Sequence, residues 1–301
     1  MKGWILYKRS KEELTEADHG VNRFLNVAAD LQLELEVYKP SQFDIISTEK
    51  KNQNILLNGQ RVSLPDFILP RLGAEATCFD LALIRQFELQ GVYSANSASA
   101  IETVKNKMLV SQLMMRAELP HPKTMLLKFP VALDLVEQEI GFPLVIKNVS
   151  GVRGIGVYLC ESATSFRDLI GLFNAQYNQQ LIVQQFVANS YGRDLRVFVL
   201  ANQVIGCMQR TANEGFKANY SLGGNVAPFP LSHEIEQLAL ACAKAVDLEI
   251  AGIDLLFAPE GFYICEANSS PGFKGMELAS GKDIATEILK QIILHVVGDQ
   301  T

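Results

Sequence analysis

Three side chains with hard oxygen donors, Asp254, Glu266 and Asn268, lie close to one another in the C-terminal part of the sequence. Two apolar runs flank a Pro-Glu-Gly turn at 259–261, and this pattern predicts a β-hairpin. Glu266 and Asn268 share one face of a strand, and Asp254 can lie beside them on the partner strand. Two carboxylates and an amide suit Mg²⁺ and leave room for phosphate oxygens. The segment therefore predicts a metal site, or else a hairpin with polar side chains and no ligand.

A second segment predicts a phosphate site. Lys147 stands at the end of an apolar run and is followed by a glycine-rich loop at 150–156. Glycine lets backbone N–H groups approach a phosphate closely, and a neighbouring lysine can neutralise phosphate charge. The spacing matches neither the Walker A loop nor the glycine-rich loop of protein kinases. The alternative is a flexible turn after an edge strand, with Lys147 on the solvent side.

The composition is that of an ordinary globular chain, with 301 residues of which 48% are hydrophobic and 20% charged. The net charge of −6 argues against a broad nucleic-acid-binding surface, so no direct nucleic-acid partner is expected. The five cysteines are scattered without a CxxC motif, which indicates reduced thiols in a cytoplasmic protein. The apolar run at 3–7 is too short for a signal sequence or a membrane span, so no membrane partner is expected either.

Strand and helix patterns alternate along the N-terminal third of the chain. Strands are expected at 4–7, 34–37, 66–69 and 92–94, and helices at 19–31 and 79–89. This alternation predicts a mostly parallel α/β sheet, although the GxGxxG motif of dinucleotide-binding folds is missing. Further strands are expected at 123–127, 143–147 and 181–186, with a hairpin at 195–199 and 204–208. Further helices are expected at 97–116, 131–140, 233–246 and 283–297.

An ordered series of motifs runs through nearly the whole chain. It comprises residues 70–73 (PRLG), 96–97 (NS), Lys107, 142–147 (FPLVIK), 154–157 (GIGV), 194–196 (DLR), 252–254 (GID) and 266–272 (EANSSPG). This series resembles the ATP-grasp ligases, and more narrowly their RimK-like branch, glutamate ligases that extend an acidic terminus. The resemblance implies an α/β ATP-grasp fold. An N-terminal pre-ATP-grasp domain with a parallel sheet (1–96) would be followed by two α+β lobes that clamp ATP (97–185 and 186–301).

The resemblance also implies roles for individual residues. Lys107 and Lys147 would contact the ATP phosphates and the adenine side, under a mobile loop that includes Ser150, Gly151, Gly154, Ile155 and Gly156. The adenine hinge would be Gln184, Gln185, Phe186 and Val187, with Gln185 at a position where the family often has Glu. Asp194 and Arg196 would lie near the ribose, the phosphates or the acceptor. Arg210 and Asn219 would bind the transferring phosphate or an acyl phosphate. The metal ligands for Mg²⁺, or Mn²⁺, would be Asp254, Glu266 and Asn268. Arg210 and Lys147 are the expected catalytic residues.

Several of these positions also allow a structural interpretation. Asp194 and Arg196 are two apart on a strand and could form a surface pair. Arg210 could cap the hairpin, and Lys107 could lie on the solvated face of a helix, with Lys105 as a competitor. The polar, glycine-rich segment at 210–225 is better explained as a functional loop over the site, because long structureless loops are otherwise uncommon.

The resemblance implies an ATP-dependent carboxylate–amine ligase that works through an acyl phosphate. It would add L-glutamate to an acidic acceptor, either a protein C-terminus or a small molecule. An anionic amino acid requires cationic partners, and Arg71, Arg153, Arg196 and Lys217 are available. Arg71 follows a strand of the expected parallel sheet, where such sheets bind ligands, but it could equally be a strand-end surface residue.

The alternatives are another ATP-grasp ligase with a different amino acid or a carrier-protein substrate, and a non-catalytic ATP-binding module. A homo-oligomer is common in the family, but nothing in the composition demands one. The four histidines do not cluster, and the sequence reveals no dedicated base.

Overall fold

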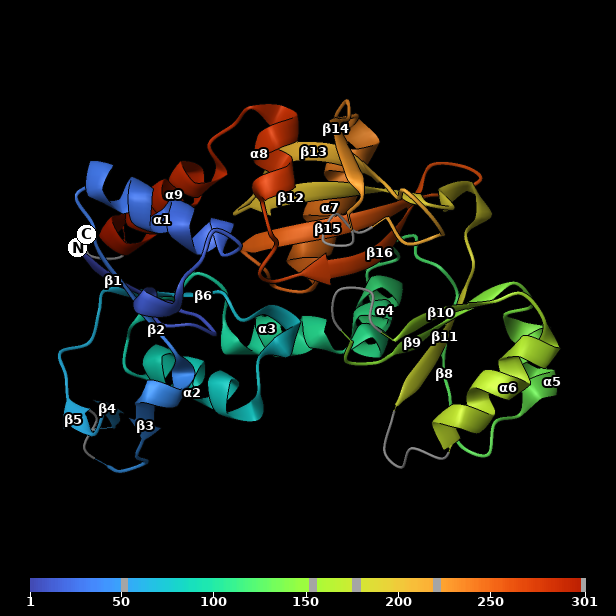
Figure 1. Cartoon of the computed structure of the whole chain (residues 1–301), viewed down its shortest axis with the longest axis horizontal. Helices are drawn as coiled ribbons and strands as arrows, with labels where there is room; N and C mark the ends of the chain where they lie inside the picture. Colours follow the sequence, from blue (N-terminus) through green and yellow to red (C-terminus); the bar gives the residue numbers. More distant parts are fainter. Residues whose placement is uncertain (50–53, 152–155, 175–179, 219–222, 299–301) are drawn as a thin grey trace.

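The computed structural model describes residues 1–49, 54–151, 156–174, 180–218 and 223–298. Within these residues the strands form three sheets of four or five strands and one small sheet of three. The three larger sheets follow one another along the chain (Figure 1). No helix of the described residues is long and apolar enough to cross a membrane.

The N-terminal sheet is parallel and has the strand order β2-β1-β6-β7. Its strands are β1 (Lys2–Leu6), β2 (Glu34–Tyr38), β6 (Phe67–Pro70) and β7 (Tyr93–Ser94). The helices that cover it are α1 (His19–Asp30) and α9 (Ile284–Gly298) on one face, and α2 (Cys78–Leu89) and α3 (Ala98–Lys105) on the other. Successive residues of a strand point to opposite faces, so Ile5 packs with α1 and α9 whereas Trp4 and Leu6 pack with α2 and α3. The expected parallel α/β sheet is therefore confirmed.

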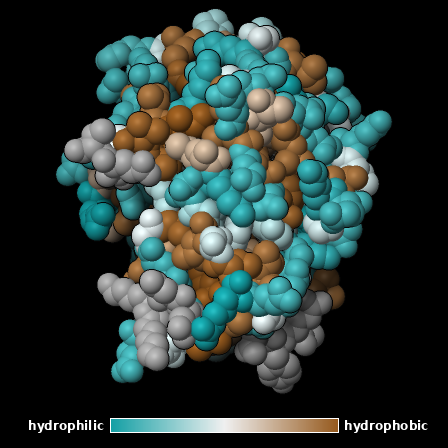
Figure 2. All heavy atoms as spheres, turned by 90° about the vertical axis from the view of Figure 1, so that its left-hand side faces the viewer, coloured by the Kyte–Doolittle hydropathy of each residue, from teal (hydrophilic) through white to brown (hydrophobic). Residues whose placement is uncertain are grey.

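The C-terminal helix α9 returns to the N-terminal sheet and packs beside α1 (Figure 1). Its residues Ile284, Ile288 and Ile292 recur every fourth position and are fully buried in the core under that sheet. The face on the left of Figure 1 carries apolar side chains among polar ones (Figure 2). The expected division at 96/97 and 185/186 stays a prediction, and the oligomeric state stays open as it was from the sequence.

The second sheet is antiparallel, with the order β10-β9-β11-β8. Its strands are β8 (Thr124–Leu126), β9 (Leu144–Asn148), β10 (Val157–Cys160) and β11 (Leu181–Gln185), and its helices are α5 (Leu133–Glu139) and α6 (Ala163–Asn174). Ile146 and Val183 are buried in the core with these helices. Because side chains alternate along a strand, Lys147 and Gln184 point to the opposite face, which no helix of the second sheet covers.

The third sheet is also antiparallel and has the order β14-β13-β12-β15-β16. Its strands are β12 (Arg193–Leu200), β13 (Gln203–Thr211), β14 (Asn225–Pro228), β15 (Ile250–Phe257) and β16 (Phe262–Asn268). The helices packed on it include α4 (Lys107–Arg116), α7 (His233–Ala245) and α8 (Lys274–Ser280). Leu195 and Ile253 are buried in the core with α4 and α7. The side chains that alternate with them, including Asp194 and Asp254, therefore point to the other face.

The structure corrects the sequence-based elements in two respects. The single helix expected at 97–116 is two helices, because Asn106 leaves the helical region (φ −98°, ψ 99°) and its side chain accepts a hydrogen bond from Leu109 N–H. Asparagine is a favoured N-cap residue, so α4 starts anew after it. The elements that the sequence did not predict include the antiparallel sheet of β3 (Phe43–Ile45), β4 (Ile55–Leu57) and β5 (Gln60–Arg61), strand β14, and helices α6 and α8.

Candidate active site

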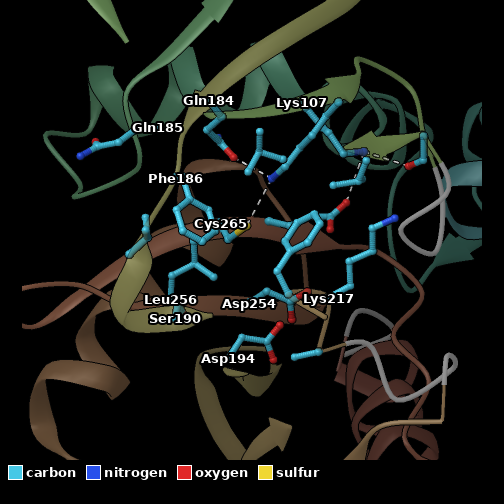
Figure 3. A pocket seen from close by; sticks show the side chains of 18 of the residues that line it. Lys107, Gln184, Gln185, Phe186, Ser190, Asp194, Lys217, Asp254, Leu256 and Cys265 are labelled. Carbon is cyan, nitrogen blue, oxygen red and sulfur yellow. Dashed lines mark hydrogen bonds and ion pairs between the residues drawn. The ribbon is translucent and has the colours of Figure 1, made fainter. Parts of the chain in front are cut away.

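A pocket lies between the second and third sheets (Figure 3). Its empty volume of about 930 Å³ includes space open to solvent. The predicted site residues that line it are Lys107, Lys147, Gly151, Gln184, Gln185, Phe186, Val187, Asp194, Arg210, Asp254 and Glu266. Ser150, Gly156, Arg196 and Asn268 are not among the lining residues. Gly154, Ile155 and Asn219 lie outside the described residues.

The ammonium group of Lys147 is fixed inside the pocket. Its Nζ donates to Gln184 Oε1 at 2.6 Å and lies 3.6 Å from Cys265 Sγ (Figure 3). The Gln184 amide is itself oriented, because its Nε2 donates to Thr124 Oγ1 at 2.9 Å. Lys147 therefore points into the pocket rather than to the solvent side of an edge strand.

Lys107, the first residue of helix α4, contacts a residue that follows β9 of the second sheet and a residue of the third sheet. Its Nζ donates to the carbonyl of Gly151 at 2.8 Å and lies 3.4 Å from Glu266 Oε1. Lys105, the competitor, instead donates to the carbonyl of Ala76. Of the two lysines, the structure brings Lys107 to the pocket.

The described part of the glycine-rich loop stays close to β9. Gly156 has a φ of +72°, and a Cβ there would lie 2.7 Å from Nδ2 of Asn148. A side chain at this position would therefore be strained and would collide with Asn148, which itself lines the pocket. Asn148 was not predicted as a site residue, and its buried Oδ1 has no hydrogen-bond partner among the described residues.

The expected adenine hinge follows β11 along one wall of the pocket. Gln185, Phe186 and Val187 line this wall, and Gln184 lies deeper beside Lys147 (Figure 3). The Gln185 side chain is exposed, and its Oε1 accepts only a long hydrogen bond of 3.5 Å from Lys123 N–H. The Gln185 amide is thus free of strong contacts with the described residues.

The three predicted metal ligands do come together on one hairpin. Asp254 on β15 lies directly opposite Glu266 on β16, and Gly252 lies opposite Asn268. Asn268 Nδ2 donates to the carbonyl of Gly252 at 3.1 Å and lies 3.5 Å from Asp254 Oδ2. No group of three or more His, Cys, Asp or Glu side chains suited to a metal occurs in the described residues. The candidate ligand set is therefore two carboxylates and one amide.

Four charged side chains form a buried network beneath this hairpin. Arg210 donates to both carboxylate oxygens of Asp194, at 2.6 and 2.7 Å, and its Nη2 also lies 3.0 Å from Asp254 Oδ2. Arg196 binds Asp254 through Nε and, at 2.9 Å, through Nη2. Gly252 leaves space for this arrangement, since a Cβ there would lie 3.1 Å from Arg196 Nη1.

The alternative in which Asp194 and Arg196 form a surface pair is therefore wrong. Each of the two residues is buried and bonds to a side chain on a neighbouring strand. The alternative in which Arg210 merely caps the hairpin is wrong as well, because its guanidinium holds two carboxylates.

Burial and charge shift the pKa values of this network in different directions. Burial raises the pKa of Asp194 against the attraction of Arg210. Burial also favours the neutral form of Asp254, but Arg196 and Arg210 outweigh it and lower the pKa of that carboxyl. Two guanidinium partners therefore keep Asp254 ionised, as a metal ligand must be.

Other lining residues escaped the sequence-based prediction. Cys265 precedes Glu266 on β16, and burial raises the pKa of its thiol although Lys147 lies beside it. Phe216 and Ala218 also reach the pocket from the segment expected to be a functional loop, together with Lys217, which the sequence had offered as a partner for an anionic amino acid. The position of Cys265 next to Glu266 in the expected strand was the only signal for it in the sequence. Regular alternation would place the two side chains on opposite faces, but the pairing of β15 and β16 is irregular at Asp254/Leu255, so alternation could not predict the side on which the thiol lies.

Comparison with known proteins identifies the family. A model of the RimK-like ATP-grasp domain matches residues 104–292, and a model of the RimK PreATP-grasp domain matches residues 14–101. The chain belongs to the RimK-like ATP-grasp family. The probable alpha-L-glutamate ligase of Marinomonas sp. (strain MWYL1) is 37% identical over 243 residues, which are 80% of this chain and 80% of that relative. This protein is accordingly an ATP-grasp ligase.

Solved structures show the same fold. The crystal structure of a RimK domain protein ATP-grasp from Sphaerobacter thermophilus DSM 20745 superimposes with a TM-score of 0.74 at 17% identity, covering 97% of this chain and 99% of that one. The ATP-grasp ligase PsnB, complexed with a phosphomimetic variant of its minimal precursor, Mg and ADP, gives a TM-score of 0.74 at 19% identity, with 98% of each chain covered. The ATP-grasp fold expected from the sequence is confirmed.

Proposed function

We propose that this ligase joins the amine of L-glutamate to a carboxylate of an acidic acceptor, with ATP converted to ADP and phosphate. The observation that carries the proposal is the pocket in which Lys107 and Lys147 face the acidic hairpin of Asp254 and Glu266. Cationic side chains opposite carboxylates that can bind Mg²⁺ suit a nucleoside triphosphate. The name of the relative in Marinomonas supports glutamate as the amine.

The cationic residues would bind and orient the phosphates. Lys147 is held by Gln184 with its ammonium directed into the pocket, and Lys107 reaches Gly151 at the start of the glycine-rich loop. Arg210 uses Nε and Nη2 for the two buried aspartates, so the N–H groups of Nη1 remain for a phosphate oxygen. These three side chains would neutralise the phosphate charge that develops during transfer.

The donor set of the hairpin fits Mg²⁺, or Mn²⁺. Asp254 and Glu266 supply carboxylates, and Asn268 uses its Nδ2 within the hairpin, so its amide oxygen stays available. Each carboxylate oxygen has two lone pairs, so the guanidinium contacts of Asp254 do not exhaust it. When bound, the metal would neutralise phosphate charge and orient the triphosphate.

The chemistry requires two successive displacements. An oxygen of the acceptor carboxylate forms a bond to the γ-phosphorus of ATP, and the bond to the leaving ADP oxygen breaks. The neutral amine then attacks the acyl carbon, and phosphate leaves while the nitrogen loses a proton. The residues named above serve to position the reactants and neutralise charge. Whether the acceptor is a protein C-terminus or a small molecule, and the cytoplasmic location, stay predictions.

Amino-acid-dependent ADP release tests the proposal. The protein is incubated with ATP, Mg²⁺, each of the twenty amino acids and a panel of dicarboxylates and acidic peptides, and products are identified by mass spectrometry. A glutamate-dependent signal with a mass gain of one glutamate residue on an acidic acceptor is expected. Release with another amino acid only would refute glutamate as the amine.

The matched variants are Glu266→Gln and Glu260→Gln. Both exchange one carboxylate for an amide on the same hairpin, but Glu260 lies exposed in its turn. Glu266→Gln should abolish turnover, whereas Glu260→Gln should retain it. Near-normal turnover of the Glu266 variant would contradict its assignment as a metal ligand.

A further inference from the structure

Arg71 lies at the point of the N-terminal sheet where the order of strands changes from one side of β1 to the other. It follows β6 directly, and its N–H donates to the carbonyl of Leu6 at 2.8 Å. From β1 the chain runs through α1 to β2 on one side, and it later adds β6 and β7 on the other side. The carboxyl ends of β1 and β6 therefore border a switch point, where open α/β sheets bind ligands.

The guanidinium of Arg71 is held in one orientation. It lies over the rings of Phe24 and Phe273, with centroids 5.7 and 5.9 Å away, and its Nη2 donates to the carbonyl of Pro271 at 2.8 Å. Residue 20, a glycine in the first turn of α1, lies against it, since a Cβ there would be 3.7 Å from Nη2. The contact with Pro271 uses one N–H of Nη2. Nε, Nη1 and the second N–H of Nη2 take no part in this clamp, so one edge of the planar fork, Nε/Nη2 or Nη1/Nη2, keeps both of its donors.

No carboxylate of the described residues forms an ion pair with Arg71. Asp18 is used by Arg9 at 2.6 Å and by Tyr7 at 2.7 Å, and Glu277 is used by His19 at 2.9 Å. Burial lowers the pKa of Arg71 to about 10, against an opposing effect of Tyr7. Arg196 and Arg210, by contrast, are both neutralised by aspartates. Arg71 is half-buried, and a half-buried cation without a counter-charge among the described residues is stabilised by a ligand that supplies the charge.

The Arg71 clamp is joined to the candidate metal hairpin. Pro271 lies in the segment between Asn268, at the end of β16, and helix α8. Asn96 fixes the same segment, because its Nδ2 donates to Ser269 O at 2.7 Å and to Ile250 O, at the start of β15, at 2.8 Å. A group bound by Arg71 would therefore have a defined position relative to the reacting phosphate.

We propose that Arg71 binds a carboxylate of one of the two organic substrates, through the free edge of its guanidinium. The inference rests on the proposed function and deepens it, because it names the side chain that selects an anionic substrate. A planar fork matches a carboxylate with two parallel hydrogen bonds, which an ammonium cannot reproduce. The carboxylate comes from the amino acid or from the acceptor, and the two sources can be separated by experiment.

The test combines enzyme variants with substrate variants, as in a double-mutant cycle. The wild type, Arg71→Met and Arg71→Lys are compared by kcat/KM on L-glutamate and its two monoamides, L-glutamine and isoglutamine. The same is done with an acidic acceptor peptide whose C-terminal carboxylate is free or amidated. Amidation of the carboxylate that Arg71 binds should cost the wild type about 10- to 100-fold, and should cost the Arg71→Met enzyme nothing further. The KM for ATP should stay unchanged.

The outcomes distinguish the sources. Loss of discrimination with the glutamate amides assigns the carboxylate to the amino acid, and loss with the peptide assigns it to the acceptor. If the Arg71→Met enzyme still prefers the free over the amidated form at every carboxylate tested, as the wild type does, the proposal is overturned. Arg85→Met is the control, because Arg85 is exposed and has a carboxylate partner in Glu102. Arg71→Lys, which keeps the charge, replaces the methionine variant if the latter does not fold.

Equilibrium binding separates this inference from the proposed function. The probe is glutarate, a dicarboxylate, titrated calorimetrically into the protein with Mg²⁺ and a non-hydrolysable ATP analogue. If no acceptor supports ligation with glutamate, the proposed function fails. The Arg71 site still stands if the wild type binds glutarate and Arg71→Met binds it at least tenfold more weakly. Equal binding by both proteins, or none by the wild type, overturns it.

Discussion

The replacement of Arg210 by methionine probes the buried network beneath the hairpin. The Arg210 side chain is only 4% exposed and holds Asp194 with two hydrogen bonds of 2.6 and 2.7 Å. Its removal leaves Asp254 with Arg196, but it leaves Asp194 without a salt-bridge partner among the described residues. Methionine keeps most of the apolar stem, so the change removes mainly the charge.

The expected loss of unfolding free energy follows from burial. Breaking a buried ion pair by removal of one partner costs about 3–5 kcal/mol, whereas an exposed pair contributes below about 1 kcal/mol. Arg85→Met is the exposed control, because Arg85 pairs with Glu102 at 3.2 Å and the two side chains are 48% and 62% exposed. Adding Asp194→Asn to Arg210→Met removes the orphaned charge and should recover part of the loss.

The assay is urea unfolding of the four proteins between pH 4 and pH 8. Burial already raises the pKa of Asp194, and removal of Arg210 raises it further. A carboxyl whose folded pKa lies above its ordinary value stabilises the fold at low pH and loses that contribution as pH rises through the folded value. The Arg210→Met penalty should therefore grow from pH 4 to pH 8. A penalty no larger than that of Arg85→Met, or one unrelieved by Asp194→Asn, would refute the reasoning.

Three further outcomes are expected. Lys147→Ala should raise the KM for ATP and lower kcat in steady-state assays, and an unchanged ATP dependence would exclude the phosphate role. Asn268→Ala should abolish turnover while unfolding free energy drops by only about 1 kcal/mol, the value of its hydrogen bond to the backbone; unfolding by calorimetry and ADP release distinguish the two effects. Burial raises the pKa of Cys160 to about 11 and of Cys242 to about 12, so the exposed Cys78 should react much faster than either of these two thiols with a thiol reagent at pH 8. Rapid reaction of either buried thiol would contradict their packing.

Local patterns were enough to predict the hairpin that brings Asp254 to Glu266 and the position of Lys147 before the glycine-rich loop. The hairpin of β15 and β16 is contiguous in sequence, so alternation and the turn at 259–261 determine that Asp254 meets Glu266. Lys147 likewise follows from alternation along β9, where Ile146 enters the core. These inferences needed only strand period and turn chemistry.

The ion network could not be predicted in this way. Arg196 meets Asp254 because β12 pairs with β15, and these strands are separated by β13, β14 and α7 in the sequence. The register of such a pair depends on the whole sheet, so the spacing of Asp194 and Arg196 suggested the wrong partners. Lys105 and Lys107 were ambiguous for a related reason, since the break at Asn106 rotates one relative to the other.

The two sides of the site differ in how firmly they are held. Asp254 is 5% exposed and bound by two guanidiniums, so its position is set before any ligand enters. Glu266 is 33% exposed at its side chain, and its ion pair with Lys107 is a longer 3.4 Å. That pair can exchange at little cost, with Lys107 turning to a phosphate and Glu266 to a metal. Variants of the network should therefore lose stability together with activity, whereas variants of Glu266 should lose activity alone.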